Sequence, residues 1–488
     1  MINIEDTAFG KNDIRGIYGK DVTEELFYYV GIGYVKYLVE HSKKLPSEMW
    51  ITVVQDARNH SPALAKALIK GVTSTGANIV DLGLAPTPIG YYSEVVGINP
   101  MVTDDNDIIG ALIVTASHNP PQYNGLKMTF NGQSFNEEQI KELKEFTFNE
   151  MKIPQIQRAV GKVNSYDLIP DYTDIMVKNF GQIGKGIKIV VDSANATGGV
   201  VAPNLYRALG CEVVELYSNP NGNFPNHHPN PSDEKTLTDI KKTVLEEKAD
   251  LGIAFDGDSD RIGVIDSKGR SISGDKLLLI YAQDVIDKMK GAAKKPVIVS
   301  EVKCSQVLYD TINELGGEAI MAKTGHGFIK SKMKETGAIL AGEMSGHTFF
   351  KDRYHGFDDA VYAGCRIIEI VAHQKKKNPN FKVENLLTPF DKVFSSPEVR
   401  FHCENELKKP TLEAFEKIVK DSPDLFGNKI KEIITLDGLR IIFDDGFALI
   451  RQSNTEPVFT LRFEAKDKAQ VEHYEKVMVG SLEKILKG

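Results

Sequence analysis

Val114-Thr-Ala-Ser-His-Asn-Pro-Pro-Gln-Tyr-Asn-Gly-Leu-Lys127 follows directly on an apolar run, 108–114, which is typical of a buried strand. The two consecutive prolines prevent a helix from starting at once. Ser117 and His118 are therefore expected on a stiff loop at the carboxyl end of a strand, where open α/β sheets bind their ligands. A serine beside a histidine is a candidate nucleophile and base, although a polar turn that happens to contain both residues explains the segment equally well.

This loop ends the first of three similar copies of one pattern. Each copy is predicted to contain, in order, a strand, a helix, a second strand and a third strand that ends in polar residues. The first strands of the copies are expected at 50–54, 187–192 and 297–301, and the helices at 63–75, 202–209 and 306–315. Continuous apolar strands that alternate with helices predict mostly parallel sheets covered on both faces. Gly76, Gly210 and Gly317 precede the second strands and are typical of helix C-caps.

Length and a change of pattern predict four domains. A chain of 488 residues is too long for one core. Linkers are expected near 155–170 and 375–388, and beyond the second the chain shows hairpin-like strands and a last helix at 468–486, typical of an α+β domain. The predicted domains are 1–165, 166–272, 273–382 and 383–488.

Composition excludes several classes of function. The 59 basic and 67 acidic residues give a formal net charge of −8 with interspersed signs, which predicts neither a nucleic-acid surface nor a membrane patch. No apolar run reaches the ~18–20 residues of a membrane-spanning helix, and no signal peptide is visible. The four cysteines are far apart, which favours reduced thiols in the cytoplasm over disulfides or zinc.

Asp256, Asp258 and Asp260 alternate in a loop after a predicted buried strand. Three carboxylates this close repel one another unless a cation holds them, and oxygen ligands suit Mg²⁺ or Ca²⁺. The spacing is not that of an EF-hand, because Arg261 stands at its glycine position and Ser267 at its closing glutamate position. We predict a Mg²⁺ site, with a solvated acidic turn as the alternative; Arg261 is placed to neutralise a phosphate beside it.

Other polar loops have weaker individual signals. Their donors and acceptors suit an anion or sugar hydroxyls, although surface turns explain each of them equally well or better. The phosphate-cradle candidates are Arg451, Ser453, Asn454 and Thr455, and the sugar-binding candidates are Glu343, Ser345 and His347. Lys303 and His326 are further polar residues near strand ends. His227 and His228 are adjacent on an extended chain and point opposite ways, which favours a structural loop over a metal site.

Taken together and in this order, the loops resemble those of the α-D-phosphohexomutase family, over essentially the whole chain. The resemblance rests on Thr115-Ala-Ser-His-Asn-Pro120, Asp256-Gly-Asp-Ser-Asp-Arg261, Gly342-Glu-Met-Ser-Gly-His347 and Ser453-Asn-Thr-Glu-Pro457. It implies fold class α/β, with three related mixed-sheet α/β domains around a central cleft and a smaller, mobile C-terminal α+β domain. One departure is Asn12, where the family often has a tyrosine.

The resemblance also implies roles for individual residues. Ser117 would carry a phosphoryl group and, with Asp256, Asp258 and Asp260, bind Mg²⁺. His118, Lys127, Arg261 and His326 would serve catalysis, with His118, His326 or another nearby base taking the proton. The substrate-binding positions would be Arg15, Lys303, Glu343, Ser345, His347, Arg451, Ser453, Asn454 and Thr455.

The implied activity is interconversion of hexose 1-phosphate and hexose 6-phosphate through a phosphoserine and a hexose 1,6-bisphosphate, with glucose 1,6-bisphosphate as activator. Mannose and glucose phosphates are favoured over glucosamine phosphate on the strength of Gly342-Glu-Met-Ser. A phosphoglucosamine mutase, a Mg²⁺-dependent phosphatase with an aspartate nucleophile, and a non-catalytic sugar-phosphate or Ca²⁺-binding protein remain alternatives. The expected protein is a cytoplasmic monomer or homodimer that binds a hexose phosphate and neither nucleic acid nor membrane.

Overall fold

The computed structural model describes residues 6–98, 103, 108–153, 160–422, 424–453 and 456–487, and the chain divides into two compact units. The first unit comprises Met1–Ser273 and Ser345–Val383, and the second comprises Gly274–Met344 and Glu384–Gly488. Each unit is described by itself. Within the described residues, no helix combines the length and the apolar character needed to cross a membrane.

The first sheet of the first unit carries the Ser117 loop. Its strand order is β1-β5-β4-β2-β3-β7, with β6 paired to β5. Strands β4, β2, β3 and β7 are parallel to one another, whereas β5 returns antiparallel to β4. The strands are β1 Ile14–Ile17, β2 Trp50–Gln55, β3 Asn78–Leu84, β4 Ile108–Val114, β5 Tyr123–Phe130, β6 Gln133–Ser134 and β7 Val163–Ser165.

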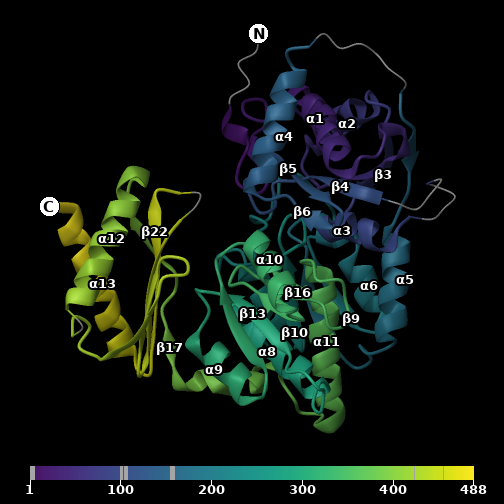
Figure 1. Ribbon diagram of the computed structural model, residues 1–488. Coiled ribbons are helices and arrows are strands. Elements are labelled where there is room, and N and C mark those ends of the chain that lie inside the picture. Colours follow the sequence, from purple (N-terminus) through teal and green to yellow (C-terminus); the bar gives the residue numbers. More distant parts are fainter. Residues whose placement is uncertain are drawn as a thin grey trace. The chain divides into compact units, whose positions relative to one another are not determined.

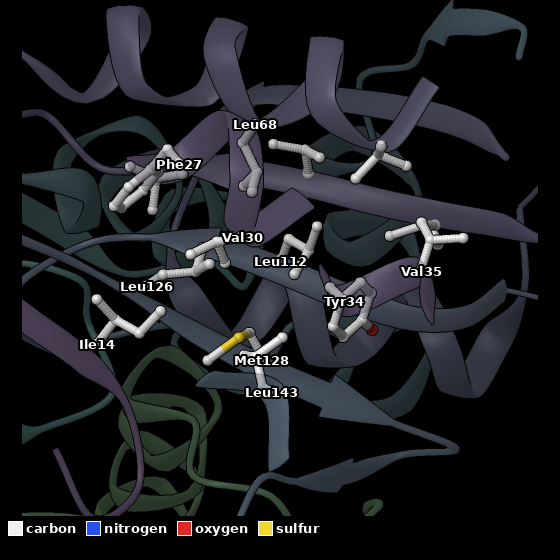
Figure 2. Close-up of a cluster of buried hydrophobic side chains, with 14 of the residues drawn as sticks. Ile14, Phe27, Val30, Tyr34, Val35, Leu68, Leu112, Leu126, Met128 and Leu143 are labelled. Atoms are coloured by element: carbon white, nitrogen blue, oxygen red, sulfur yellow. The ribbon is translucent and has the colours of Figure 1, made fainter. Parts of the chain in front are cut away.

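Helices cover both faces of this sheet. In Figure 1, α1, α2 and α4 lie on one side and α3 on the other. The helices and 3-10 turns of this part are α1 Glu24–Ser42, α2 Ser61–Thr73, α3 Thr87–Val96, α4 Glu137–Glu150, η1 Asp6–Ala8 and η2 Pro46–Glu48. The core between α1, α2, α4 and the sheet is drawn in Figure 2, where Phe27, Leu68, Leu112 and Leu143 are all fully buried. A fully buried side chain of this size stabilises the fold by about 1.5–3 kcal/mol.

Glycine allows α1 and α2 to approach closely. A Cβ on Gly71 would lie 2.0 Å from Tyr28 O, and one on Gly31 would lie 2.6 Å from Leu68 O. Helix α1 begins at Thr23, whose side chain accepts a hydrogen bond from Leu26 N, as an N-cap threonine does. The long helix therefore starts at a fixed residue and buries one face against α2.

The rest of the first unit holds the acidic loop, at the end of β10. The second sheet has the order β12-β11-β10-β8-β9, with β8 parallel to β9 and β10, and β11 antiparallel to β10. Its elements and those that follow are α5 Ile169–Phe180, β8 Lys188–Asp192, η3 Thr197–Val200, α6 Ala202–Ala208, β9 Glu212–Leu216, α7 Thr238–Glu246, β10 Leu251–Phe255, β11 Ile262–Ile265, β12 Ser271–Ile272, β16 Thr348–Phe350 and α11 Ala360–Lys377.

The second unit contains the third repeat and the C-terminal domain. Strands β14, β13 and β15 are parallel, with β13 in the middle. Its elements up to the linker are α8 Gly274–Lys288, β13 Val297–Glu301, α9 Gln306–Glu314, β14 Glu318–Ala322, α10 His326–Thr336, β15 Leu340–Gly342 and η4 Val383–Lys392. The same order, with the first strand of each copy between its second and third, recurs as β4-β2-β3, β10-β8-β9 and β15-β13-β14. The predicted threefold repeat of α/β domains is confirmed.

The C-terminal domain is α+β, as predicted. An antiparallel sheet of order β17-β22-β21-β20-β19, with β18 also on β22, carries helices α12 and α13. Its core is rich in phenylalanine, with Phe415, Phe459 and Phe463 fully buried. The elements are β17 Phe394–Ser395, β18 Val399–His402, α12 Asn405–Asp421, β19 Ile430–Ile434, β20 Leu439–Phe443, β21 Gly446–Gln452, β22 Val458–Ala465 and α13 Lys468–Lys487.

Three local predictions need correction or qualification. Gly76 and Gly210 adopt the expected positive φ, but in the third copy it is Gly316, at φ +94°, and not Gly317. The basic end of the expected linker at 375–388 is the last turn of α11, where cations stabilise the carbonyl end of a helix. Of the expected linker at 155–170, residues 155–159 lie outside the described residues, and β7, which pairs with β3, occupies its middle.

Candidate active site

The Ser117 backbone has an unusual conformation. Its φ is +51°, a left-handed value that costs about 1–2 kcal/mol for a residue other than glycine. Ser117 N donates to Thr115 Oγ1 at 2.9 Å, and Thr115 Oγ1 donates to Asp56 Oδ2 at 2.8 Å. The side chain is also fixed, since Ser117 Oγ donates to Asp256 Oδ2 at 2.9 Å and lies 3.2 Å from His118 Nδ1. A buried hydroxyl is thus held in one orientation against a carboxylate and an imidazole.

Gly257 allows the serine loop and the acidic loop to meet. A Cβ on Gly257 would lie 2.2 Å from Ser117 O, which is far inside van der Waals contact. The loops after β4 and β10 therefore approach at backbone distance, and only glycine fits between them.

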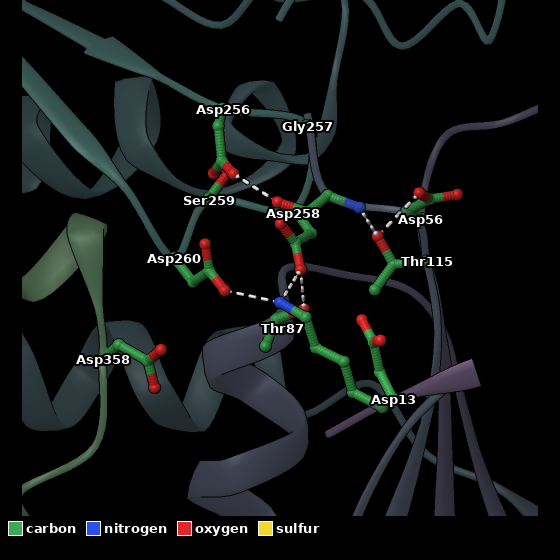
Figure 3. Close-up of polar contacts among 12 residues, drawn as sticks. Asp13, Asp56, Thr87, Thr115, Asp256, Gly257, Asp258, Ser259, Asp260 and Asp358 are labelled. Carbon is green, nitrogen blue, oxygen red and sulfur yellow. Dashed lines mark hydrogen bonds and ion pairs between the residues drawn. The ribbon is translucent and has the colours of Figure 1, made fainter. Parts of the chain in front are cut away.

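The three aspartates form one buried group. Asp256, Asp258 and Asp260 are fully buried, and they offer oxygen atoms that lie within 4.8 Å of one another. Lys127 Nζ lies 2.6 Å from Asp258 Oδ2 and 2.5 Å from Asp260 Oδ2. Thr87 Oγ1 also donates to Asp258 Oδ2, at 2.5 Å. Figure 3 shows the three aspartates arranged along their loop, with Thr87 beside Asp258.

Burial and neighbouring charges shift the pKa values of Asp256 and Asp260 in opposite directions. Burial, with the charges of Asp260 and Asp258, raises the pKa of Asp256 well above its usual value. Burial alone would also raise the pKa of Asp260, but Lys127 and His347 hold it below the usual value. Burial would lower the pKa of Lys127, yet Asp258 and Asp260 raise it well above the usual value, so the ammonium stays charged. The pKa of Asp256 is raised even though Arg261 Nε lies 3.9 Å from Asp256 Oδ2, the same oxygen to which Ser117 Oγ donates.

The aspartates fit a hard metal ion. Asp258 Oδ1 and Asp260 Oδ1 are buried and accept no hydrogen bond from the residues that the structure describes, and a buried acceptor without a partner is costly. The group offers only carboxylate oxygens, which Mg²⁺ prefers. A second group, Asp260, His347 and Asp358, also has ligand atoms within 4.8 Å of one another, but its nitrogen ligand suits Mg²⁺ less well.

Two arginine side chains contact residues of the site around Ser117. Arg15 Nη1 donates to Asn119 Oδ1 at 3.0 Å, and Arg261 Nε donates to His347 Nε2 at 3.0 Å. The Arg261 guanidinium and burial lower the pKa of His118 well below its usual value, so the ring is neutral at pH 7. Arginine and lysine side chains around a hydroxyl nucleophile suit a dianionic phosphoryl group.

The second unit holds Glu343 of the predicted sugar-binding residues, together with Lys303 and His326. Glu343 Oε1 accepts from Gly325 N at 2.7 Å, next to His326 at the start of α10. Lys303, at the end of β13, lies 3.3 Å from Glu398 Oε2. Burial would lower the Lys303 pKa, but Glu301 and Glu398 raise it, so the ammonium stays charged.

The predicted phosphate cradle belongs to the same unit. Arg451 Nε donates to Asp437 Oδ2 at 3.2 Å, and Asp437 Oδ2 also accepts from Thr324 N at 3.0 Å. The Asp437 carboxylate therefore joins Arg451 to the loop that ends at His326. Lys408, a buried residue of α12, donates to Ser453 O at 2.9 Å and to the carbonyl of Glu456. Asn454 and Thr455 lie outside the described residues.

The predicted residues thus fall into two sets. The first unit holds Arg15, Ser117, His118, Lys127, Asp256, Asp258, Asp260, Arg261, Ser345 and His347. The second unit holds Lys303, His326, Glu343, Arg451 and Ser453. Ser345 O accepts from Ser232 Oγ at 2.9 Å. His227 Nε2 lies 3.0 Å from Asp192 Oδ2.

Sequence reasoning missed the supporting residues Asp56, Thr87, Thr115 and Asp358. Asp56 and Thr115 directly follow the strands β2 and β4, so their place after a strand end was a usable signal. Thr87 begins α3, and its contact with Asp258 spans 171 residues of chain. Asp358 Oδ2 lies 3.2 Å from His347 Nδ1. No local pattern marks these last two, because only the fold brings them to the site.

Comparison with known proteins places the chain in a family. Models of the phosphoglucomutase/phosphomannomutase family match it in four consecutive pieces: α/β/α domain I at residues 6–153, domain II at 170–269, domain III at 273–390 and the C-terminal domain at 398–481. All of the expected loops lie within these matches.

Relatives match along the whole length. A phosphomannomutase/phosphoglucomutase of Pseudomonas aeruginosa is 38% identical, over 98% of this chain and 96% of the relative. A phosphoglucomutase of Neisseria gonorrhoeae is 37% identical, over 97% and 96%. The crystal structure of a phosphoglucomutase/phosphomannomutase family protein from Burkholderia thailandensis matches with a TM-score of 0.87 and 34% identity, over 99% of each chain. The chain belongs to the phosphoglucomutase/phosphomannomutase family.

Proposed function

We propose that the chain interconverts hexose 1-phosphate and hexose 6-phosphate, of mannose, glucose or both, through a phosphoryl group on Ser117. The observation that carries the proposal is the hydrogen bond from Ser117 Oγ to Asp256 Oδ2, in a site that also holds a neutral His118 and the charged Lys127. The names of the full-length relatives, phosphomannomutase/phosphoglucomutase and phosphoglucomutase, support the same reaction.

The transfer chemistry takes place at Ser117. The phosphoryl group moves from Ser117 Oγ to the 6-hydroxyl of a hexose 1-phosphate: the Oγ–P bond breaks, the O6–P bond forms, and the hydroxyl proton passes to a base. His118, His326 or another nearby base takes this proton. Lys127 and Arg261 neutralise the transferring phosphoryl oxygens, because phosphoryl transfer is accelerated mainly by positioning and charge neutralisation.

The substrate contacts are those predicted from the sequence. Glu343 and Ser345 accept hydrogen bonds from the sugar hydroxyls. Arg451, Ser453, Asn454 and Thr455 hold the phosphate that does not react. The 1,6-bisphosphate then turns over: the O1–P bond breaks, an Oγ–P bond forms on Ser117, and O1 takes up the proton that the base received in the first step, leaving hexose 6-phosphate. Loss of the bisphosphate before this step leaves an unphosphorylated enzyme, so glucose 1,6-bisphosphate is the expected activator.

Asp256, Asp258 and Asp260, with Ser117, are the expected Mg²⁺ ligands. When bound, the ion neutralises the phosphoserine and stabilises charge on the leaving serine oxygen. Without a cation, burial and repulsion favour a proton on Asp256, and that proton would have to leave before the ion binds. Apparent Mg²⁺ affinity is therefore expected to fall at low pH.

One assay tests the proposal and its nearest alternatives. Purified protein with Mg²⁺ and a trace of glucose 1,6-bisphosphate is given glucose 1-phosphate, mannose 1-phosphate or glucosamine 1-phosphate, and the 6-phosphates are measured. Comparable rates for glucose and mannose, with glucosamine far slower, support the proposal. A strong glucosamine preference favours a phosphoglucosamine mutase with the same mechanism. Sustained release of inorganic phosphate favours a phosphatase and contradicts the proposal.

The remaining expectations concern domain limits, assembly and location. We infer domains at 1–165, 166–272, 273–382 and 383–488, supported by the separate sheets and by the ranges of the four family matches. We also infer a monomer or homodimer located in the cytoplasm. Limited proteolysis, light scattering and cell fractionation test these three points.

A further inference from the structure

Arg58 is buried directly beneath the serine loop. Its side chain is 0% exposed, and its Nε donates to Asp56 Oδ2 at 3.0 Å. Its two terminal nitrogens donate to four backbone carbonyls of the loop: Nη1 to Pro120 O at 2.6 Å and Tyr123 O at 3.0 Å, and Nη2 to Ser117 O at 2.9 Å and Asn119 O at 2.6 Å. One guanidinium thus spans the loop from its nucleophile to the start of β5.

These contacts use all of the hydrogen-bonding capacity of the side chain. A guanidinium has five N–H donors and no acceptor, and each of the five has a partner here. Arg58 therefore has no donor left for a phosphate, which distinguishes it from Arg15 and Arg261. Any effect of Arg58 on the reaction must therefore come from the way it holds the serine loop.

The same contacts fix the Ser117 backbone at both ends. Arg58 holds the carbonyl of Ser117 while Thr115 Oγ1 accepts from the amide. Asp56 Oδ2 accepts from both Arg58 Nε and Thr115 Oγ1, so one carboxylate ties the two supports together. The left-handed φ of Ser117 is kept by this arrangement, and it aims Oγ at Asp256.

We propose that Arg58 is a positioning residue for phosphoryl transfer: with Asp56 and Thr115 it holds Ser117 in the left-handed conformation that directs Oγ to the acidic group, and it contacts neither sugar nor phosphate. The expected effect on the reaction rate rests on the proposed function. The expected effect on the conformation of the loop, which one guanidinium holds, does not depend on the reaction.

Arg58→Lys is the main test variant, because a lysine has three donors without the planar fork and leaves at least two of the five contacts unmade. Misplacing a nucleophile by about 1 Å lowers a rate by about 100-fold. We expect kcat to fall by about that factor and KM for the hexose 1-phosphate to stay within about threefold of wild type. Thr115→Val, which keeps the shape and removes one hydroxyl, should reduce kcat in the same direction by less.

Arg366→Lys is the matched control, since Arg366 is also fully buried and paired, with Asp352 at 2.8 Å, and belongs to no part of the site. It should lower the melting temperature without the selective loss of kcat. Hydrogen–deuterium exchange of the 115–125 peptide should rise in Arg58→Lys and stay unchanged in Arg366→Lys.

Four results separate the possibilities. A wild-type protein that isomerises none of the sugars defeats the proposed function, while the exchange measurement still decides the role of Arg58. A wild-type kcat in a folded Arg58→Lys variant overturns the positioning role. Unchanged exchange at 115–125 overturns it as well, and a tenfold or larger rise in KM would show that Arg58 contacts substrate after all.

Discussion

Ser117 Oγ and Asp256 Oδ2 lie 2.9 Å apart although 139 residues separate them in the chain. They come from corresponding places in two copies of the repeat, the loops that follow β4 and β10. Because the carboxyl ends of parallel strands carry the functional loops of α/β folds, a repeated domain can bring two such loops together. One copy contributes the nucleophile and the other the acidic ligands.

Substitution of Gly257 by alanine should impair the site, because the new Cβ would lie 2.2 Å from Ser117 O. Forcing a methyl group into a packed contact destabilises by about 1–3 kcal/mol, and here it would displace the nucleophile. We expect at least a tenfold loss of kcat, measured in the coupled mutase assay. Gly480→Ala in α13 meets nothing within 4 Å and should instead stabilise by about 0.5–1 kcal/mol; equal effects of the two variants would refute this explanation.

Asp258→Asn should weaken metal binding. The variant replaces a fully buried carboxylate oxygen that accepts no hydrogen bond from the described residues by a neutral ligand. We expect the Mg²⁺ concentration for half-maximal activity to rise by at least about tenfold, as determined by a Mg²⁺ titration of initial rates. Asp174→Asn, at an exposed position on α5, serves as the control. An unchanged titration midpoint in Asp258→Asn would exclude this residue as a ligand.

Arg451→Lys should affect substrate affinity more than turnover. Lysine keeps the charge but lacks the fork that binds a phosphate through two hydrogen bonds, and it loses the ordering contact with Asp437. We expect KM for the hexose 1-phosphate to rise by about tenfold, with kcat changed less. A steady-state analysis with Arg207→Lys, an exposed arginine remote from the predicted residues in the sequence, provides the comparison. A large loss of kcat at constant KM would contradict a phosphate-holding role.

The stability of the protein should depend on pH through Asp359. This buried residue accepts hydrogen bonds from Tyr172 and Tyr354, and burial raises its pKa to about 6. In an unfolded chain it titrates near ~3.9, so the folded protein binds the proton more tightly. The contribution of Asp359 is therefore complete below pH ~4 and is lost as the pH rises through about 6.

The Asp359→Asn variant has no titrating group at this position, so comparison with wild type isolates the contribution of Asp359 to the pH dependence of stability. The stability of wild type relative to the variant should fall by on the order of 2 kcal/mol between pH 4 and pH 7. Melting temperatures of both proteins at several pH values give the difference. A difference that stays constant over this range would show that folding does not raise the pKa of Asp359.

Much of the fold follows from the sequence because its signals are local. The apolar runs that end at Val114, Phe255 and Ala341 predict parallel strands, and polar residues follow each of them. The repeat then predicts which loops share a function. The left-handed residue in the third copy was placed one position late, at Gly317, because two consecutive glycines give no local reason to choose between them.

The rest of the site depends on contacts between distant segments. Thr87 and Asp358 reach the acidic group only through the packing of α3 and the chain before α11, and neither has a distinctive neighbour in the sequence. Arg58 is different, since it follows a predicted strand end. The sequence alone predicts that a charged residue at this position is exposed to solvent. Only the structure shows that Arg58 is buried and donates hydrogen bonds to four backbone carbonyls of the loop.

The most direct test of the central claim is to follow one labelled phosphoryl group. Wild type and Ser117→Ala are incubated with Mg²⁺ and glucose 1,6-bisphosphate carrying a phosphorus label, and the protein is mapped by peptide mass spectrometry before and after addition of unlabelled glucose 1-phosphate. The account predicts label on Ser117 alone, its transfer to the sugar on addition of substrate, and no label and no turnover in Ser117→Ala. Isomerisation at the wild-type rate by Ser117→Ala, or label on an aspartate of the acidic loop, would contradict it.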